Sequence, residues 1–154
     1  MIYDLNASNN SILTEVTGSF TQDLNLEGNM LPLTVTYALT TKKISNLNSL
    51  TVDGEVFSNV FKGELNISMN VVTSIDLLGL GNPVDYDVLA TQDVLTIENY
   101  FAKDVGLIKS ESYITYQLDQ GLLAVLANLQ LDLGIPENLT VENTQEIENY
   151  LISE

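Results

Sequence analysis

The amino-acid sequence predicts a mainly β protein built on one antiparallel sheet, and three observations support this fold class. Threonine, valine, isoleucine and leucine fill long stretches, apolar and polar residues alternate with a period of two in several of them, and tight-turn sequences separate them. Such alternation is typical of a sheet with one buried face and one wetted face. At 154 residues, the chain is expected to form a single domain (1–154) with a core that needs no disulfides.

Two long strands are predicted in the first third of the chain. The first runs from Ile12 to Leu26, with Gly18 as a candidate bulge or bend, and Glu27-Gly28-Asn29 then turns the chain. The second strand begins near Pro32, because proline cannot donate to a strand ladder. One side of it, which we expect to face a core, presents Leu31, Leu33, Val35, Tyr37 and Leu39.

A hairpin from about Leu50 to Val72 is predicted by Asp53-Gly54, a strong tight-turn dipeptide between two apolar runs. Its second strand has the clearest alternation in the chain, with Phe61, Leu65, Ile67, Met69 and Val71 on one side and Lys62, Glu64, Asn66, Ser68 and Asn70 on the other. Residues 74–83 contain two glycines, an asparagine and a proline, and predict a loop. Further strands are expected from about Val94 and over Val105 to Leu118.

The chain after Gly121 fits more than one kind of element. Helical spacing is shown by Leu122, Val125, Leu126 and Leu129, whereas strand-like alternation is shown by Ala127, Leu129, Leu131 and Leu133. We favour a strand for the second half, ended by Gly134-Ile135-Pro136. Residues 119–130 therefore stay open between helix and strand, and so do residues 143–152, where Thr144 could cap a short helix.

The charge balance excludes whole classes of partner. The chain has 21 acidic residues, five lysines and no arginine, which gives a formal net charge of −16. Nucleic acids and anionic membrane surfaces are bound through lysine and arginine, so this surface would repel both. No run approaches the roughly 20 apolar residues that span a bilayer, so no integral membrane segment is expected. A signal or lipid-anchor segment, if present, is expected to lie outside this chain.

Catalytic signatures are few. The chain has no histidine and no cysteine, which excludes histidine-bound zinc, a serine–histidine triad and a cysteine nucleophile. A pair of carboxylates could serve a glycosidase, but acidic residues are so abundant that any two look paired. The sequence therefore predicts a protein that is not an enzyme, with no cofactor. Seven tyrosines without tryptophan fit strand packing better than a carbohydrate-stacking platform.

Calcium is a weaker alternative. Hard oxygen ligands gather around a glycine-containing loop, at Asp76, Asn82, Asp85, Asp87 and Asp93. The regular spacing of a calcium-binding loop that ends in a glutamate is missing. A solvated acidic loop, with no bound metal, is the expectation.

One local pattern stands out, a ten-residue run in which two apolar segments meet at Lys103-Asp104. Its residues are Tyr100, Phe101, Ala102, Lys103, Asp104, Val105, Gly106, Leu107, Ile108 and Lys109. The run resembles the Y-[YF]-A-K-G-V-G-[LI]-[VI]-K hairpin of hypothetical secreted and lipid-anchored proteins of Bacteroides-like Gram-negative bacteria. Residues 50–60 are similar to the V-x-G-x-x-[FY]-x-x-V segment of the same proteins.

The resemblance implies a single curved antiparallel sheet, a half-barrel or open barrel similar to periplasmic lipoprotein carriers, with one short covering helix or loop. It also implies a cell-envelope or periplasmic setting, with a lipid anchor in the full-length precursor, and it implies no activity. Asp104 stands where the family often has glycine, and aspartate tolerates a left-handed backbone better than most residues.

The residues of this run also have a direct physical interpretation. We expect a tight turn at Lys103-Asp104, and Gly106 permits a bulge or a close approach. Strict alternation would place Lys103 and Lys109 on the same side of the strand as Val105 and Leu107. Either a bulge shifts the alternation, or that side changes from apolar to charged along the strand. Both lysines are expected to pair with nearby acids, and the alternative is a pair that grips an anion.

The expected function is that of a non-catalytic scaffold or binding module, with an apolar ligand or a protein as its partner. The alternative is a carrier that holds a lipid-like molecule on the concave face of the sheet. In either case the leucine-rich stretch from Leu122 to Leu133 is the expected cover, because an open sheet forfeits roughly 1.5–3 kcal/mol for each large apolar side chain left exposed. The oligomeric state is not predicted.

Overall fold

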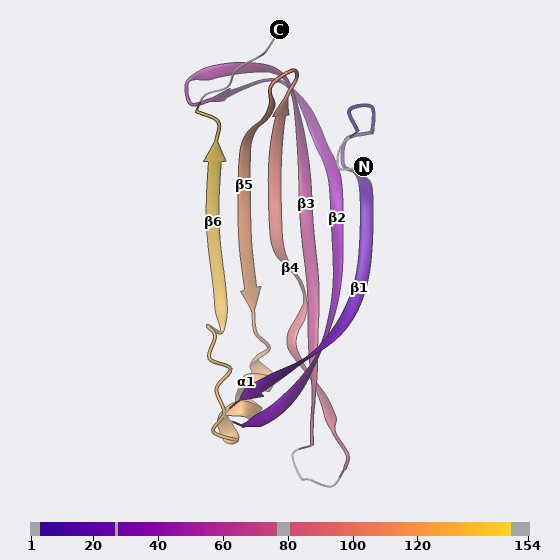
Figure 1. Cartoon of the computed structure of the whole chain (residues 1–154), viewed down its shortest axis with the longest axis vertical. Helices are drawn as coiled ribbons and strands as arrows, with labels where there is room; N and C mark the ends of the chain where they lie inside the picture. The colour runs from indigo at the N-terminus through magenta and orange to yellow at the C-terminus, as the bar shows by residue number, and fades with distance from the viewer. Residues whose placement is uncertain (1–3, 27, 77–80, 149–154) are drawn as a thin grey trace.

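The computed structural model describes residues 4–26, 28–76 and 81–148, and its architecture is one antiparallel sheet of six strands that neighbour each other in sequence order (Figure 1). The strands are β1 (Ser11–Leu26), β2 (Asn29–Val52), β3 (Glu55–Ile75), β4 (Val84–Ala102), β5 (Gly106–Gln117) and β6 (Asn138–Glu146). Within the described residues the one helix is α1 (Gln120–Asn128), between β5 and β6. The predicted mainly β fold with an open sheet is confirmed, because β1 and β6 lie at opposite edges.

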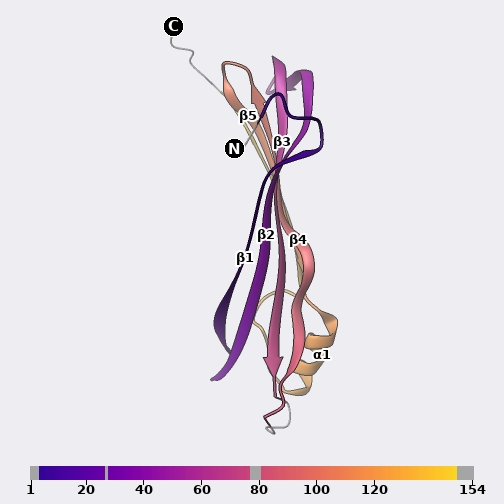
Figure 2. The same cartoon turned by 90° about the vertical axis from the view of Figure 1, so that its right-hand side faces the viewer.

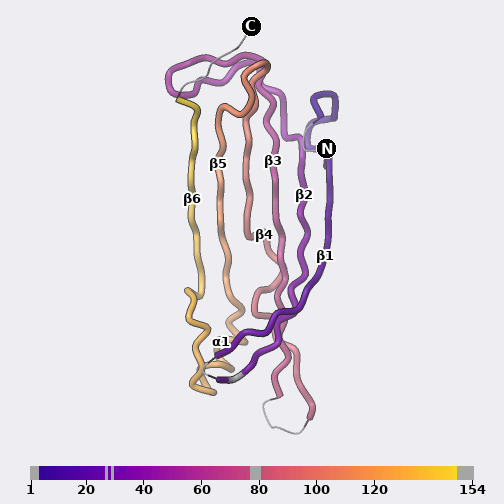
Figure 3. The backbone as a smooth tube through the Cα atoms, in the orientation of Figure 1, coloured from indigo at the N-terminus to yellow at the C-terminus, as the bar shows by residue number. Residues whose placement is uncertain are grey.

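The predicted hairpin around Asp53-Gly54 is present and is longer than expected. Both turn residues have positive φ, 47° and 81°, as a two-residue hairpin turn with a type I′ backbone requires. The strands that it joins, β2 and β3, are 24 and 21 residues long. Near the turn the hairpin bends over the β4–β5 turn towards the end of β6, as the backbone trace shows (Figure 3).

The prediction of a bulge at Gly18 is wrong. The register of β1 against β2 shifts between Ile12 and Thr14, so the extra residue is Leu13. Gly18 pairs with Tyr37, and a Cβ at this position would lie 2.5 Å from the Tyr37 hydroxyl oxygen. The glycine therefore makes room for a tyrosine ring across the strand, which is a packing reason and not a backbone one.

The expected start of the fourth strand near Val94 is also wrong, since β4 begins at Val84. The register between β3 and β4 shifts three times over residues 67–72 of β3. These irregularities break the period of two in the first half of β4 and hide the strand from a sequence pattern. In the predicted loop, residues 77–80 lie outside the described residues.

The strand favoured for the second half of 122–133 is wrong too. Residues 120–128 are helical, and the next strand is β6 at Asn138. Asp119 is the N-cap, and its carboxylate accepts a hydrogen bond from the backbone N–H of Leu122 at 3.0 Å. The open segment 143–152 is strand up to Glu146, and residues 149–154 lie outside the described part of the chain.

Two separate apolar clusters stabilise the two ends of the sheet. At one end α1 buries Leu122 and Leu126 against Val88 and Leu89 of β4 and Leu118, with Met69 packed beside them. The expected cover is therefore real, but it reaches only this end of the sheet. Each of these leucines contributes about 1.5–3 kcal/mol through burial.

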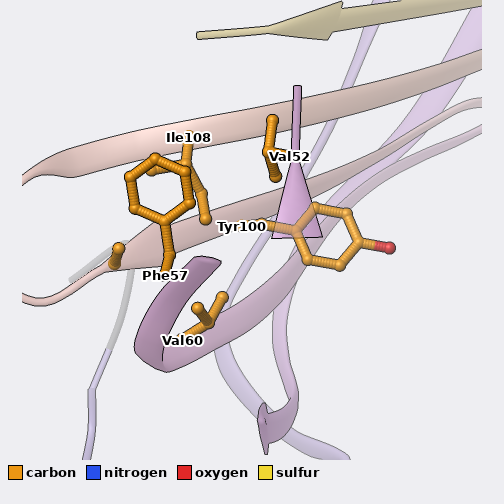
Figure 4. Packing of buried hydrophobic residues seen from close by; sticks show 6 residues of the cluster. Val52, Phe57, Val60, Tyr100 and Ile108 are labelled. Atoms are coloured by element: carbon orange, nitrogen blue, oxygen red, sulfur yellow. The ribbon is translucent and has the colours of Figure 1, made fainter. Parts of the chain in front are cut away.

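The second cluster lies where the β2–β3 hairpin folds over. It consists of Val52, Phe57, Val60, Tyr100, Ala102 and Ile108. Figure 4 shows the Phe57 ring beside Ile108 and the Tyr100 ring between Val52 and Val60, with its hydroxyl pointing away from the cluster. The bent hairpin thus carries its own side chains onto β4 and β5.

Between the two clusters the sheet is a single layer, as the view along its edge shows (Figure 2). The expected core behind Leu31, Leu33, Val35, Tyr37 and Leu39 is therefore only partly present: Leu31 and Val35 are buried, while Leu33, Tyr37 and Leu39 keep part of their surface exposed. Among the described residues no helix has the length and apolar character that crossing a membrane requires.

Candidate functional site

The middle of the sheet presents a continuous row of apolar side chains on one face. Strand register places one residue of each strand directly opposite the next, and residues opposite each other point to the same face. The row consists of Val16, Leu39, Ile67, Leu95, Ile114 and Val141. It crosses the sheet from one edge to the other without a polar residue.

Neighbouring rows on the same face extend this surface. Towards the bent hairpin the next row is Thr14, Thr41, Leu65, Ile97, Ser112 and Asn143, and towards α1 the register aligns Phe20, Val35, Val71 and Leu89. We call this side, defined by these rows and the Val16–Val141 row, the apolar face. Four of its apolar members are well exposed, Val16 by 50%, Phe20 by 52%, Ile114 by 42% and Val141 by 43%, whereas Val35 and Leu89 are buried.

The opposite side, here called the acidic face, carries the charge. By register it holds Glu15, Asp23, Lys42, Lys62, Glu64, Asp85, Asp87, Asp93, Glu98, Lys109, Glu111, Glu142 and Glu146. Among the strand residues that the structure describes, two charged ones lie elsewhere: Glu55 at the hairpin end and Lys43 on the apolar face. The two faces therefore differ almost completely in charge.

An ion-pair network organises the acidic face near the bent hairpin. Glu64, Glu98 and Glu111 stand opposite one another on three strands, an arrangement of like charges that by itself destabilises a sheet. Lysines compensate: Lys42 lies 3.2 Å from Glu64, and Lys62 lies 2.8 Å from Glu98. Three of the five lysines are used in such pairs.

Lys109 completes the network and lies 3.1 Å from both Glu111 and Glu146. The hydrogen bonds to Glu111 and Glu146 raise the pKa of Lys109. Burial acts to raise the pKa of Glu111, but hydrogen bonds from Tyr100 and Lys109 outweigh it and lower that pKa. Lys109 therefore does not serve to bind an external anion, because its ammonium group is already paired with two carboxylates of the protein.

Tyr100 links the network to the apolar cluster beneath the hairpin. Its ring is buried in the cluster, while its hydroxyl donates to Glu111 at 2.9 Å and lies 3.3 Å from Glu98. Burial raises the pKa of Tyr100. Burial also acts to lower the pKa of Lys62, but the hydrogen bonds to Glu98 and Tyr100 overcome it and raise that pKa. These side chains thus bind one another, and their contacts connect β3, β4 and β5.

The charged residue of the apolar face, Lys43, is withdrawn from solvent. It is 2% exposed, its Nζ donates to the backbone carbonyl of Leu5 at 2.6 Å, and it lies 5.9 Å from the centre of the Phe61 ring. The segment before β1 thus folds over this lysine. As a result the accessible part of the apolar face is electrically neutral.

A pocket of about 660 Å³ lies at the bent-hairpin end of the sheet. Residues that line it come from four places: Leu5 before β1, Asn46 to Asn48 in β2, Asn59 to Phe61 in β3, and Phe101 to Gly106 around the β4–β5 turn. The Phe61 and Phe101 rings lie 6.2 Å apart at a tilt of 50°. Aromatic and aliphatic residues together with three asparagines thus make up most of its wall, with the charged Lys103 and Asp104 at the turn.

The ten-residue run singled out in the sequence lies at this pocket. Lys103, Asp104 and Val105 form the turn between β4 and β5, and Asp104 adopts the left-handed conformation with φ of 63°. Phe101 to Gly106 line the pocket, whereas Tyr100, Ile108 and Lys109 belong to the cluster and the network on the other side. The register shift opposite Tyr100 and Phe101 leaves Ile108 as an extra residue, which resets the strand parity.

Three of the four aspartates considered for calcium accept hydrogen bonds within the protein. Asp85 accepts from the Ser74 hydroxyl, Asp87 from the Asn70 side chain at 3.0 Å, and Asp76 from the backbone N–H of Gly81 at 2.6 Å. Within the described residues no group of three or more acidic side chains is arranged to hold a metal ion.

The sequence predicted the alternating strands, and it offered an apolar binding face only in the alternative of a concave face that holds a lipid-like ligand. It assigned these residues to a core because alternation normally indicates one buried face. The segregation of charge could have been seen from the printed alternation of β3, where Lys62 and Glu64 fall on one parity and Glu55, beside the hairpin turn, is the exception. The lack of a second layer has no local signal. Comparison of the chain with protein-family models, curated proteins and solved structures finds no match, so function is inferred here from the arrangement of residues alone.

Proposed function

We propose that this protein is a non-catalytic binding module whose binding surface is the apolar face of the sheet. The observation that carries the proposal is the Val16–Val141 row, six apolar residues in register across six strands and partly exposed at its edges. Monomeric proteins seldom expose contiguous apolar surface on this scale, and where they do it usually serves to bind.

The energetics of folding support the same proposal. The two buried clusters lie at the ends of the sheet, so the middle rows contribute little to the stability of the isolated chain. A sequence that needed only solubility could place threonine or serine there, as it does in the neighbouring positions Thr17, Ser19 and Thr21 of β1. Three of the six residues of this row, Val16, Ile114 and Val141, are 42–50% exposed, and this exposure has a solvation cost that binding would recover.

The absence of catalysis stays part of the proposal. The carboxylates near the bent hairpin, Glu64, Glu98, Glu111 and Glu146, are paired with lysine or tyrosine. The titratable side chains on the apolar-face side of β2 are the covered Lys43 and Tyr37, whose ring lies against Gly18. The cell-envelope setting implied by the ten-residue run also stays a prediction, and the binding proposal does not depend on it.

Binding of the neutral apolar dye Nile red tests the proposal. We expect the wild-type chain to enhance Nile red fluorescence. The enhancement per protein chain should be strongest in dilute solution, where chains do not cover each other's apolar faces. Ile114→Lys places a charge on the apolar face and should weaken dye binding at least about tenfold. The matched control, Thr115→Lys, adds the same charge one residue further along β5 on the acidic face and should leave binding unchanged. Equal dye binding by both variants over the whole dilution series would refute the proposal.

A second candidate function is that of a carrier for a lipid-like ligand, and the pocket at the bent-hairpin end supports it. A volume of about 660 Å³ falls within the range of about 300–1,000 Å³ of small-molecule sites. The ligand would lie beside Phe61 and Phe101, with Lys103 available for an acidic headgroup. The proposed position is thus the end of the sheet and not its middle.

Uptake of a fluorescent fatty acid tests the carrier function. Asn48→Trp fills the pocket wall with a large ring and should lower uptake at least about tenfold. Ser49→Trp is the control, because Ser49 is the next residue of β2 and does not line the pocket. Absence of uptake by the wild-type chain, or equal uptake by the two variants, would contradict this candidate.

A further inference from the structure

We infer that the partner bound by the apolar face is a second copy of this chain, so that two sheets pack face to face in a two-layer sandwich. The inference rests on the proposed function and deepens it by naming the occupant of the same surface. Four observations support a second copy: the half-built second layer, the segregation of charge, the size of the face and the symmetry of its central row.

The second layer of the sandwich is already begun within one chain. Helix α1 packs on the apolar-face side against Leu33, Met69 and Val71, residues of the same parity as the central row. A helix with its side chains is about 10 Å across, and packed sheets lie about 10 Å apart. A second sheet over the middle rows would therefore continue the layer that α1 starts (Figure 2).

Segregation of charge solves the main difficulty of pairing two chains of net charge −16. In a face-to-face pair every carboxylate of the two acidic faces points outward, away from the partner. The two acidic faces would then be separated by both sheets and the apolar layer, well over 10 Å, whereas charges are screened over about 8 Å at physiological salt. A basic partner, in contrast, would be drawn to the acidic face and not to this one.

The apolar face is large enough for a stable pair. Six strands about 4.8 Å apart and four levels of same-face side chains about 6.8 Å apart, from Thr14 to Phe20 of β1, span about 25–30 Å by 20–27 Å with the side-chain margins. The resulting area is at most about 500–800 Å² on each partner, because Val35 and Leu89 within it are already buried, and it lies at the lower end of the range for stable complexes, which centres on about 800 Å² per partner. Nothing smaller than a sheet or a similarly broad surface would cover it.

The central row is also nearly self-complementary. From one edge to the other it reads valine, leucine, isoleucine, leucine, isoleucine, valine. A twofold axis reverses the order of the strands in one partner, and this row then meets apolar residues at every position. Interfaces with twofold symmetry require such self-complementarity.

Sedimentation velocity of the full chain over about 1–100 µM, at about 50 mM and about 1 M NaCl, tests the inference. We expect a monomer–dimer equilibrium whose dissociation constant falls severalfold at high salt, because screening weakens the repulsion between the two acidic chains. Ile114→Lys should raise the dissociation constant at least about tenfold, and Thr115→Lys should change it less than about twofold.

Three outcomes would overturn the second-copy inference. The chain could remain monomeric at all concentrations, the dimer could weaken with salt, or the dimer could resist Ile114→Lys, which would indicate pairing through the β1 or β6 edge. The Nile red experiment separates this failure from failure of the proposed function. If the chain is a monomer and Ile114→Lys but not Thr115→Lys weakens dye binding, the apolar face remains a binding surface for another partner. If the chain is a monomer and neither variant changes dye binding, both the proposed function and the second-copy inference are refuted.

Discussion

The two faces of the middle of the sheet are built from the same strands and solve opposite problems. The acidic face holds rows of carboxylates that would repel each other, and it compensates them with Lys42, Lys62 and Lys109. The apolar face holds side chains that water disfavours, and within the described part of the chain α1 covers it only near Leu89 and the segment before β1 only over Lys43. One face is thus complete within the monomer, and the other is incomplete.

The difference teaches that the stability of this fold and its function reside in different places. Stability comes from the clusters at the two ends and from the backbone ladders of long strands, whereas the middle of the apolar face is free to serve a partner. Substitutions at the ends and in the middle should therefore have different consequences.

Leu122→Ala should have the largest effect on the monomer. Leu122 is 0% exposed between α1 and the sheet, and its truncation leaves a cavity that costs about 3 kcal/mol of unfolding free energy. Val16→Ala in the central row should cost less than about 0.5 kcal/mol, because Val16 is half-exposed. Urea denaturation followed by circular dichroism, at a concentration below dimer formation, measures both. Similar losses for the two variants would erase the distinction between ends and middle.

Glu111→Gln should lower the unfolding free energy by about 1–2 kcal/mol at pH 7, since it removes the charge that pairs with Lys109 and one of the two oxygens that bind Tyr100 and Lys109. The pKa of Glu111 is lowered in the fold, so its contribution is present above the ordinary carboxyl pKa and is lost as the pH falls through the lowered value. The gap between wild type and variant should therefore close below about pH 4. Denaturation curves from pH 7 to pH 3 measure this gap, and a constant gap would contradict the assigned network.

Lys43→Met should leave the unfolding free energy within about 1 kcal/mol of wild type, because replacing a buried charge by an apolar side chain of similar length is often neutral or stabilising. The same change removes the hydrogen bond to the Leu5 carbonyl. Backbone hydrogen exchange of residues 4–10 should become faster while that of β2 stays slow. A large global loss of stability would show instead that the charge of Lys43 is compensated better than the structure indicates.

Asp104→Gly should have the smallest effect, a gain of a few tenths to about 1 kcal/mol in unfolding free energy. Asp104 has φ of 63°, a conformation that glycine adopts at less steric cost, although the greater freedom of glycine in the unfolded chain offsets part of the gain. Asp104→Val should lose about 1–2 kcal/mol at the same position. Thermal melting of the pair measures the difference, and equal melting temperatures would argue against backbone strain at this turn.

Much of the fold could be predicted because its signals are local. Alternation in β1, β2 and β3 depends on neighbouring residues only, and Asp53-Gly54 fixes its own turn through two positive φ angles. Helix α1 lies in the segment that the sequence leaves open between helix and strand, because Leu129 fits both the helical spacing from Leu122 and the alternation with Leu131. The capping residue Asp119 was the signal that could have favoured the helix.

The candidate site was less predictable because it depends on contacts between distant strands. The Val16–Val141 row exists only once five registers are set, and the bulges at Leu13 and Ile108 decide which residues share a face. The alternation of β3 shows which residues lie together but not whether another layer covers them. The ten-residue run was found from its sequence, but its position at a pocket arises from Leu5 and Asn46 to Asn48, which are remote in the chain.

The most direct test of the central claim compares the reactivity of one thiol on each face. The chain has no cysteine, so Ile114→Cys and Thr115→Cys each introduce a single thiol on adjacent residues of β5. If the apolar face binds a second copy, the rate of maleimide labelling at position 114 should fall at least about tenfold between about 1 and 100 µM protein, while the rate at position 115 stays constant. Rates that are independent of concentration at both positions, or that fall equally at both, would contradict the claim.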